Sequence, residues 1–220
     1  MSWIYLSHEL NELTPTFGGE NKFETLNRRE IAEGVSSRNQ TWKIFNHIGT
    51  HVDFPAHFDP NGKTLSQYGP KDLEFTKVGL VTVRGVKPGL LIETMHCKFP
   101  KDLKNCDFLL FKTGFERKRK EEDYIFDGPG LHPEACKELL KIAPKLRGIG
   151  LDFISLTSFP NREMGREAHR ILLGSKHRKS GILIVEDMKL SVLSRAPKTL
   201  LVCPIRVTGA DGAPVTVLAR

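Results

Sequence analysis

The alternation of apolar and polar residues along the chain predicts more strands than helices. Short apolar runs bounded by Gly, Pro or Asp predict strands over residues 79–84, 90–94, 107–112, 148–156, 181–185 and 199–208. Two other segments, 133–143 and 163–173, place apolar residues every three or four positions, which predicts helices. Because strands and helices do not alternate strictly, the pattern indicates a strand-rich α/β or α+β fold with a mixed sheet.

The first sixty residues have a different character. Short apolar runs at 3–6 and 42–45 stand among Pro, Gly and Asn, so we expect irregular structure with short strands there. The chain contains no repeat, low-complexity tract or Ser/Gly-rich linker, and we therefore expect residues 1–220 to form one domain.

Composition excludes several classes of protein. With 39% hydrophobic and 27% charged residues, the 220-residue chain is suited to a packed core and is not disordered, collagen-like or coiled-coil. No apolar run approaches the ~18 residues of a membrane span. The N-terminus also lacks the pattern of a signal peptide. We therefore expect a cytoplasmic protein with no membrane partner.

The chain carries a formal net charge of +7, which raises the question of nucleic-acid binding. Its densest basic run, 117–120, is preceded by Glu116 and followed by the acidic run 121–123. This arrangement favours a self-compensated, solvated loop over a phosphate-binding stripe, so nucleic acid is not an expected partner. The four cysteines include no C-x-x-C pair and are interpreted as free thiols, which leaves histidine and carboxylate as possible metal ligands.

One segment, residues 45–58, concentrates chemically active side chains. Pro55 argues against a helix there, and the Ile, Thr and Val residues favour an extended chain. In a strand, alternate residues share a face, so the side chains of His47, His51 and Asp53 are expected to point the same way. Gly49 lies between them and would leave an open notch. Two imidazoles and a carboxylate around such a notch are suitable ligands for Zn²⁺, Mn²⁺ or Fe²⁺.

His57 lies beyond Pro55 and need not follow this alternation. It can fold back over the notch as a fourth ligand or as an acid/base group, and the spacing does not decide between these two roles. The ordinary alternative for the segment is a set of polar groups at a strand end, bonded to one another and to water. Three histidines and an aspartate around a glycine favour a metal site over that alternative.

Residues 47–57, HIGTHVDFPAH, resemble the HxGTHxDxPxH motif of the putative cyclase family. This group of metal-dependent hydrolases includes bacterial kynurenine formamidases and isatin hydrolases. The resemblance extends to segments 6–10, 148–156, 167–173 and 182–186, so it covers most of the chain. It implies a single domain with the swivelling β/β/α fold of this family, a homodimer or tetramer, and a place in tryptophan catabolism.

The resemblance also implies roles for individual residues. The implied metal ligands are His47, His51, Asp53, His169 and Glu186. Asp53 would bridge to a second ion where two are bound, and His57 would be the general acid/base. Phe17 would pack on the ring of the substrate. One or two divalent ions are expected, Zn²⁺ first and Mn²⁺ as the alternative.

Two departures from the family pattern leave alternatives open. Segment 174–181 is basic and longer than the usual turn, which admits His177 as a rival to His169. Segment 16–19 lacks the proline that is usual in formamidases, which leaves room for a different substrate. The chain contains no G-x-S-x-G, H-E-x-x-H, Walker or G-x-G-x-x-G motif. The sequence therefore gives no sign of a serine hydrolase, a zinc protease of the H-E-x-x-H type or a nucleotide-binding enzyme.

The resemblance implies hydrolysis of a C–N amide bond in a small molecule as the reaction. Metal-activated water would attack the carbonyl, and His57 would transfer the proton to the leaving nitrogen. The expected substrate is an aryl formamide such as N-formylkynurenine, which would yield kynurenine and formate. A cyclic amide of the isatin type, or the substrate of an uncharacterised relative, is the alternative. Two further hypotheses are a metal-binding protein without activity and a basic nucleic-acid-binding protein.

Overall fold

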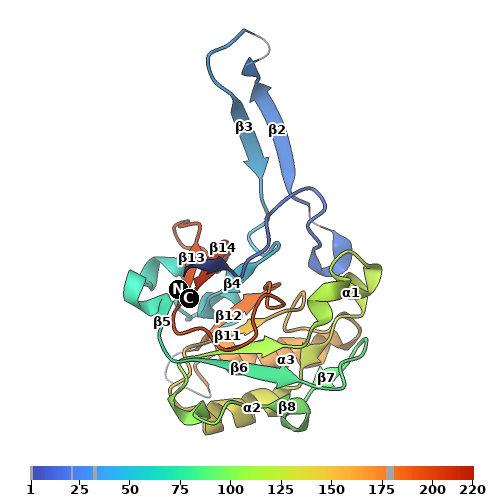
Figure 1. Cartoon of the computed structure of the whole chain (residues 1–220), viewed down its shortest axis with the longest axis vertical. Helices are drawn as coiled ribbons and strands as arrows, with labels where there is room; N and C mark the ends of the chain where they lie inside the picture. The colour runs from blue at the N-terminus through green and yellow to red at the C-terminus, as the bar shows by residue number, and fades with distance from the viewer. Residues whose placement is uncertain (1, 21, 32–33, 177–180) are drawn as a thin grey trace.

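A curled, ten-stranded mixed sheet forms the centre of the molecule (Figure 1). The computed structural model describes residues 2–20, 22–31, 34–176 and 181–220. Along the sheet the order is β5 (Glu74–Phe75), β13 (Leu200–Pro204), β14 (Gly212–Ala219), β4 (His51–Asp53), β12 (Leu183–Glu186), β11 (Gly148–Leu151), β9 (Phe108–Lys112), β6 (Val78–Val83) and β8 (Cys97–Lys98), and β1 (Ile4–Tyr5) also pairs with β14. Strands β12, β11, β9 and β6 are parallel, whereas β4 runs antiparallel to both β12 and β14.

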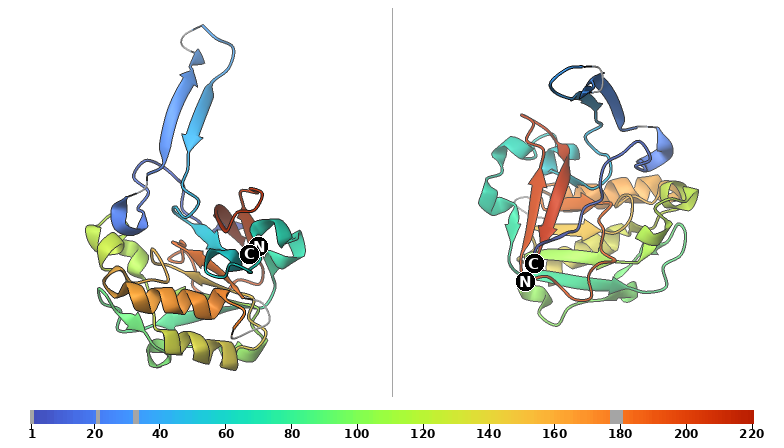
Figure 2. Two further views of the ribbon diagram at one scale, coloured as in Figure 1. Left: turned by 180° about the vertical axis from the view of Figure 1, so that it is seen from behind. Right: turned by 45° about the horizontal axis from the view of Figure 1, so that its top comes forward.

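The parallel strands are buried on both faces, which explains their continuous apolar runs. Leu109 and Phe111 of β9 pack into one core together with α2 (Pro133–Ile142) and α3 (Arg162–Leu173). Phe108 and Leu110, which alternate with them, pack into a second core on the other face of the sheet. The two helices therefore cover one face of the sheet, as the view from behind shows (Figure 2).

Glycines in β11 make room for the second core. A Cβ atom at Gly148 would lie 2.6 Å from the ring of Phe108, and one at Gly150 would lie 2.3 Å from Sδ of Met188. Neither distance leaves room for a side chain, so Phe108 and Met188 fill the space over these two glycines.

Three smaller elements complete the described structure. β7 (Leu91–Ile92) pairs in parallel with β10 (Gly130–Leu131), and the short helix α1 (Glu122–Phe126) lies near Phe17. β2 (Glu24–Arg29) and β3 (Asn39–Lys43) form an antiparallel hairpin that projects from the body as an arm (Figure 1). No helix in the described part of the chain has the length and apolar character needed to cross a bilayer.

The predicted elements agree with the structure where local pattern is decisive. Both helices are confirmed, as are the strands predicted at 79–84 and 107–112 and the fold class, a mixed, strand-rich α/β fold. The strand predicted over 148–156 is wrong beyond Leu151, because the chain turns there to enter the site. The strand predicted over 199–208 ends at Pro204, and β14 was not predicted.

Candidate functional site

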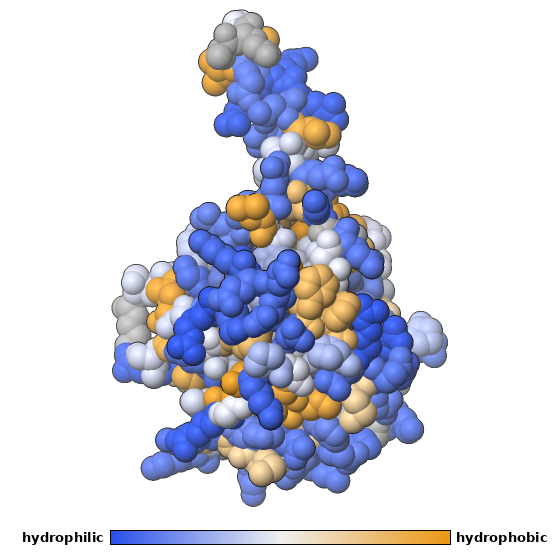
Figure 3. Space-filling model, turned by 90° about the vertical axis from the view of Figure 1, so that its right-hand side faces the viewer, coloured by the Kyte–Doolittle hydropathy of each residue, from blue (hydrophilic) through white to orange (hydrophobic). Residues whose placement is uncertain are grey.

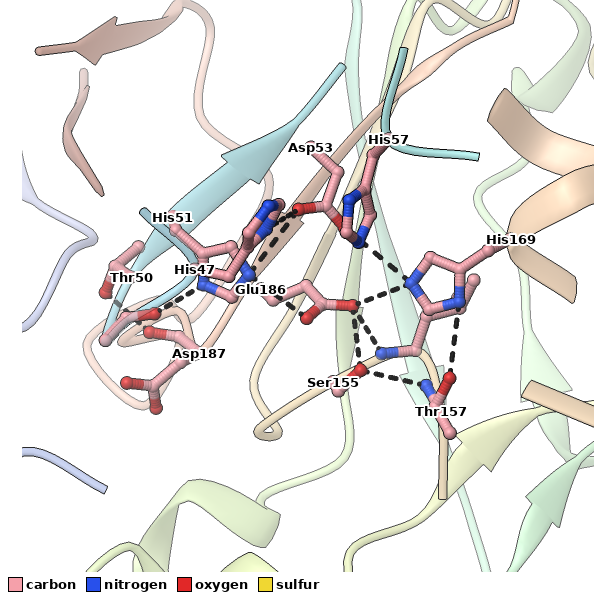
Figure 4. Close-up of polar contacts among 12 residues, drawn as sticks. His47, Thr50, His51, Asp53, His57, Ser155, Thr157, His169, Glu186 and Asp187 are labelled. Atoms are coloured by element: carbon pink, nitrogen blue, oxygen red, sulfur yellow. Dashed lines mark hydrogen bonds and ion pairs between the residues drawn. The ribbon is translucent and has the colours of Figure 1, made fainter. Parts of the chain in front are cut away.

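Adjacent strands bring the first polar side chains together. β4 pairs with β12 so that His51 lies opposite Glu186, and alternation along β4 turns Asp53 to the same face. All three side chains are buried. His169 reaches the same place from α3, which packs beside β12 (Figure 4).

His47 reaches the cluster by a different route from the one its spacing suggested. The extended run predicted over residues 47–53 is wrong in its first half, because β4 begins only at His51 and residues 46–47 form a turn. Gly49 has φ +60°, which bends the chain back. The notch expected at Gly49 is also wrong, since a Cβ atom there would lie 2.5 Å from Cδ2 of Leu10. His47 nevertheless places Nδ1 2.8 Å from Oδ1 of Asp53.

The distances within the cluster suit ligands that share a cation. Nε2 of His51 lies 3.5 Å from Oδ1 of Asp53 and 3.3 Å from Oε2 of Glu186. Nε2 of His169 lies 3.7 Å from Oδ2 of Asp53 and 3.4 Å from Oε1 of Glu186. Three potential ligand sets result among the described residues, each with its donor atoms within 4.8 Å of one another. One set is His47, His51 and Asp53, and a second is Asp53, His169 and Glu186, so Asp53 belongs to both. The third set is His47, His57 and Asp211, which are all partly exposed.

Two buried carboxylates so close together require positive charge. Burial by itself lowers the pKa of His51, but the hydrogen bond with Glu186 and the charge of Asp53 raise that pKa to about 9. The pKa of His169 is raised in the same way, against burial, by hydrogen bonds with Asp53 and Glu186. A divalent cation would supply the same positive charge and displace these protons, so the donor set fits a metal ion.

Backbone carbonyls orient the two buried imidazoles. His51 Nδ1 donates to the carbonyl of Gly49 at 2.8 Å, and His169 Nδ1 donates to the carbonyl of Gly165 at 2.9 Å. Because a carbonyl can only accept, each ring carries its proton on Nδ1 and turns Nε2 toward the carboxylates. Glu186 is held in turn by the backbone N–H of Leu156 at 2.6 Å. Such outer contacts are typical of metal ligands in proteins.

His57 lies beside the cluster, partly exposed to the pocket, and is paired with Asp211. Pro55 begins the 3₁₀ turn that carries His57. The imidazole of His57 stacks on that of His47, with ring centroids 4.1 Å apart. Nδ1 of His57 lies 2.8 Å from Oδ2 of Asp211. Burial lowers the pKa of His57 from its ordinary value. Asp211 was not predicted as a site residue, because an Asp-Gly pair in a sequence indicates only a turn.

Asp187 directly follows Glu186 and is held by contacts with Arg119 and Tyr124. Its φ is +50°, a left-handed conformation that is rare for a residue with a side chain. Arg119 forms an ion pair with its carboxylate at 2.7 Å, and the hydroxyl of Tyr124 donates to it at 2.5 Å. The solvated loop predicted for residues 117–120 is therefore wrong at Arg119, which is largely buried against Asp187.

The five candidate ligands, His57 and Asp187 line a cavity of about 390 Å³. Besides the cluster, its walls include Phe17, Phe58 and two arginines of α3, Arg162 and Arg166. Phe58 stacks on His169 with ring centroids 4.7 Å apart, and Phe17 packs against Phe159 at 5.3 Å. The cavity therefore combines a polar floor with aromatic walls.

The structure places all seven residues predicted for the site along this one cavity. His47, His51, Asp53, His57, His169 and Glu186 form the floor, and Phe17 lies in the wall. His177, the rival to His169, lies outside the described residues.

Comparisons with known proteins point the same way. The family model described as Putative cyclase matches residues 4–157. The chain is 29% identical over 226 positions to a kynurenine formamidase of Bacillus cereus (strain ATCC 10987 / NRS 248), covering 99% of this chain and 97% of the relative. It is 28% identical over 228 positions to a kynurenine formamidase of Geobacillus thermodenitrificans (strain NG80-2), with the same coverage.

Solved structures share the fold. Isatin hydrolase A from Labrenzia aggregata, bound to benzyl benzoate, matches with a TM-score of 0.77 at 21% identity, covering 99% of this chain and 93% of that one. A potential metal-dependent hydrolase with cyclase activity matches with a TM-score of 0.75 at 21% identity, covering 99% and 96%.

Proposed function

The chain belongs to the putative cyclase family, and we propose that it is a metal-dependent hydrolase of the C–N bond of an aryl formamide. One observation carries this proposal. Five buried or half-buried residues that line a cavity form two potential ligand sets with Asp53 in common, and His57 stands beside them, paired with Asp211. Full-length similarity to kynurenine formamidases supports an arylformamidase-like reaction, from N-formylkynurenine to kynurenine and formate.

His47, His51 and Asp53 would hold one ion, and Asp53, His169 and Glu186 would hold a second ion where two are bound. When bound, such an ion supplies an activated water as nucleophile near neutral pH and polarises the carbonyl under attack. Zn²⁺ suits the mixed nitrogen and oxygen donors, and Mn²⁺ is the alternative.

His57 would act as the general acid/base. The carboxylate of Asp211 accepts a hydrogen bond from Nδ1, so Nε2 is the basic atom that remains for the reaction. The lowered pKa keeps this imidazole neutral at pH 7, ready to take a proton from water. The same nitrogen would then return the proton to the leaving aniline nitrogen. General acid/base catalysis of this kind contributes roughly 10²–10⁴-fold.

Phe17 would pack on the aromatic ring of the substrate. Its ring lies in the wall of the cavity against Phe159. The second candidate substrate is a cyclic amide of the isatin type, which the shared fold with isatin hydrolases supports. It would use the same floor and the same histidine.

The proposal is tested by metal analysis and turnover of the purified protein. We expect one or two equivalents of Zn or Mn and hydrolysis of N-formylkynurenine, with both lost in His51→Ala. In His57→Ala, turnover should fall by at least 100-fold while most of the metal is retained. Metal without turnover of either the formamide or isatin would refute the proposed reaction and leave a metal site that acts on another substrate or on none. A chain that takes up no metal on reconstitution would refute the site itself.

We also propose that the protein works as a homodimer or tetramer in the cytoplasm, with residues 1–220 as one domain. The arm formed by β2 and β3 supports self-association, because a two-stranded hairpin is marginally stable alone in water. Trp42 and Leu26 on this arm are 61% and 47% exposed, and Figure 3 shows a few hydrophobic residues on it among hydrophilic ones. A second copy of the chain would cover them. Light scattering should give a dimer or larger, and a monomer at micromolar concentration would refute this assembly.

A further inference from the structure

The helix that delivers His169 also carries two cations into the wall of the cavity. Arg162, Arg166 and His169 follow one another at intervals of four and three residues, so they share one face of α3. All three line the cavity. At 1.5 Å per residue, Arg162 starts roughly 10 Å along the helix from His169. The cavity therefore has a ligand cluster at one end and positive charge at the other.

Arg162 differs from its neighbour in its partners. Arg166 forms an ion pair with Glu163, one turn away. Within the described residues, no carboxylate lies within ion-pair distance of Arg162, and its guanidinium lies over aromatic rings instead. Its guanidinium carbon lies 4.0 Å from the ring centroid of Phe159 and 6.0 Å from that of Phe17.

The surroundings hold this guanidinium over the rings. Cation–π attraction favours the stack on Phe159. The turn at Gly18, with φ +76°, brings the backbone so close that a Cβ atom there would lie 3.3 Å from the ring of Phe159 and 3.9 Å from the guanidinium of Arg162. A planar guanidinium held by its face keeps its N–H edge available for a carboxylate. Glu20, which lines the same cavity, offers a negative charge for an ammonium group.

We propose that Arg162 recognises the carboxylate of the substrate and so selects aryl formamides that carry an amino-acid tail. This inference rests on the proposed function and adds a residue that would determine its substrate specificity. Seven bonds separate the formyl carbon of N-formylkynurenine from its carboxylate carbon, a reach of roughly 8–9 Å when extended at ~1.3–1.5 Å per bond. That reach is comparable to the rise of roughly 10 Å along α3 between His169 and Arg162, and it would place the aromatic ring between them beside Phe17.

The test compares two formamides that differ only in the carboxylate, N-formylkynurenine and N-formylkynuramine, with the metal-loaded protein. We expect the wild type to prefer N-formylkynurenine in kcat/KM by about tenfold or more, which corresponds to about 1.4 kcal/mol. Arg162→Gln should abolish most of this preference, chiefly through KM. Arg162→Lys should keep part of the preference, because lysine retains the positive charge but lacks the paired N–H donors of the guanidinium.

Arg170→Gln is the matched control, because it removes the same charge from an exposed position of α3 where Arg170 pairs with Glu167. It should leave the preference unchanged. Equal losses for both formamides in Arg162→Gln, or a wild type without preference, would overturn the inference and leave Arg162 as a packing residue.

A separate readout distinguishes this inference from the proposed function. Titration calorimetry with the products kynurenine and kynuramine measures carboxylate recognition without turnover. If the wild type hydrolyses no formamide, the proposed function fails. The binding ratio then decides the role of Arg162: a preference for kynurenine that Arg162→Gln removes supports it, and equal binding of the two products overturns it.

Discussion

The contact between His57 and Asp211 allows a quantitative prediction for Asp211→Asn. Asp211 accepts from Nδ1 of His57 at 2.8 Å and from Nδ2 of Asn46 at 2.8 Å, and it lies 3.3 Å from Nε2 of His47. Burial opposes its ionisation, yet the hydrogen bond from His57 and the neighbouring imidazoles lower its pKa. The carboxylate therefore stays ionised and keeps the proton of His57 on Nδ1.

Asparagine preserves the shape but removes the charge. A hydrogen bond to a charged group contributes about 1.5–3 kcal/mol when it is shielded from solvent. Because the side chain of Asp211 is 38% exposed, we take the lower half of that range. At 1.36 kcal/mol per decade, a loss of about 1.5–2.3 kcal/mol lowers kcat/KM by roughly 10- to 50-fold. Because Asp211 also raises the pKa of His57, its loss should move the acidic limb of the pH profile to lower pH.

The assay is hydrolysis of N-formylkynurenine across pH, read beside elemental analysis of the bound metal. Asp102→Asn is the control, since Asp102 pairs with Asn105 far from the site. A plateau within twofold of the wild type would refute the role of Asp211. A loss of activity in proportion to a loss of bound metal would also refute the role of Asp211 in positioning His57, because Asp211 would then act through the metal ligand His47.

Three further predictions concern pH, metal and packing. Because burial lowers the pKa of His57 and the base must be neutral, kcat/KM should fall only as pH drops through a value below 6.5; an acidic limb above pH 7 would contradict this. Chelation of the metal should lower Tm at pH 7, since Asp53 and Glu186 are buried carboxylates that need a cation, and an unchanged Tm after verified removal would count against the site. Gly148→Ala should cost about 1–3 kcal/mol in urea unfolding, because its Cβ would lie 2.6 Å from Phe108. Gly69→Ala, with only an ordinary contact at 3.6 Å, should cost much less, and equal costs would refute the packing argument.

Much of the site could be predicted because its chemistry is local. His51 and Asp53 share a face through strand alternation alone, and the structure agrees. The helix carrying His169 followed from its apolar period and is confirmed. Gly49 shows the limit of the same reasoning. Its spacing suggested a notch, but its positive φ and the side chain of Leu10 gave it a different role.

The residue pattern alone determined the donor types, the helices and the fold class, since these depend on side-chain chemistry and on neighbours a few positions away. Only the tertiary structure decided which distant groups meet. Asp211 lies 154 residues from His57, and it reaches that ring because β14 pairs with β4. Arg162 meets Phe17 only because the N-terminal turn folds over α3. Long-range strand pairing and packing create such contacts, and no local spacing encodes them.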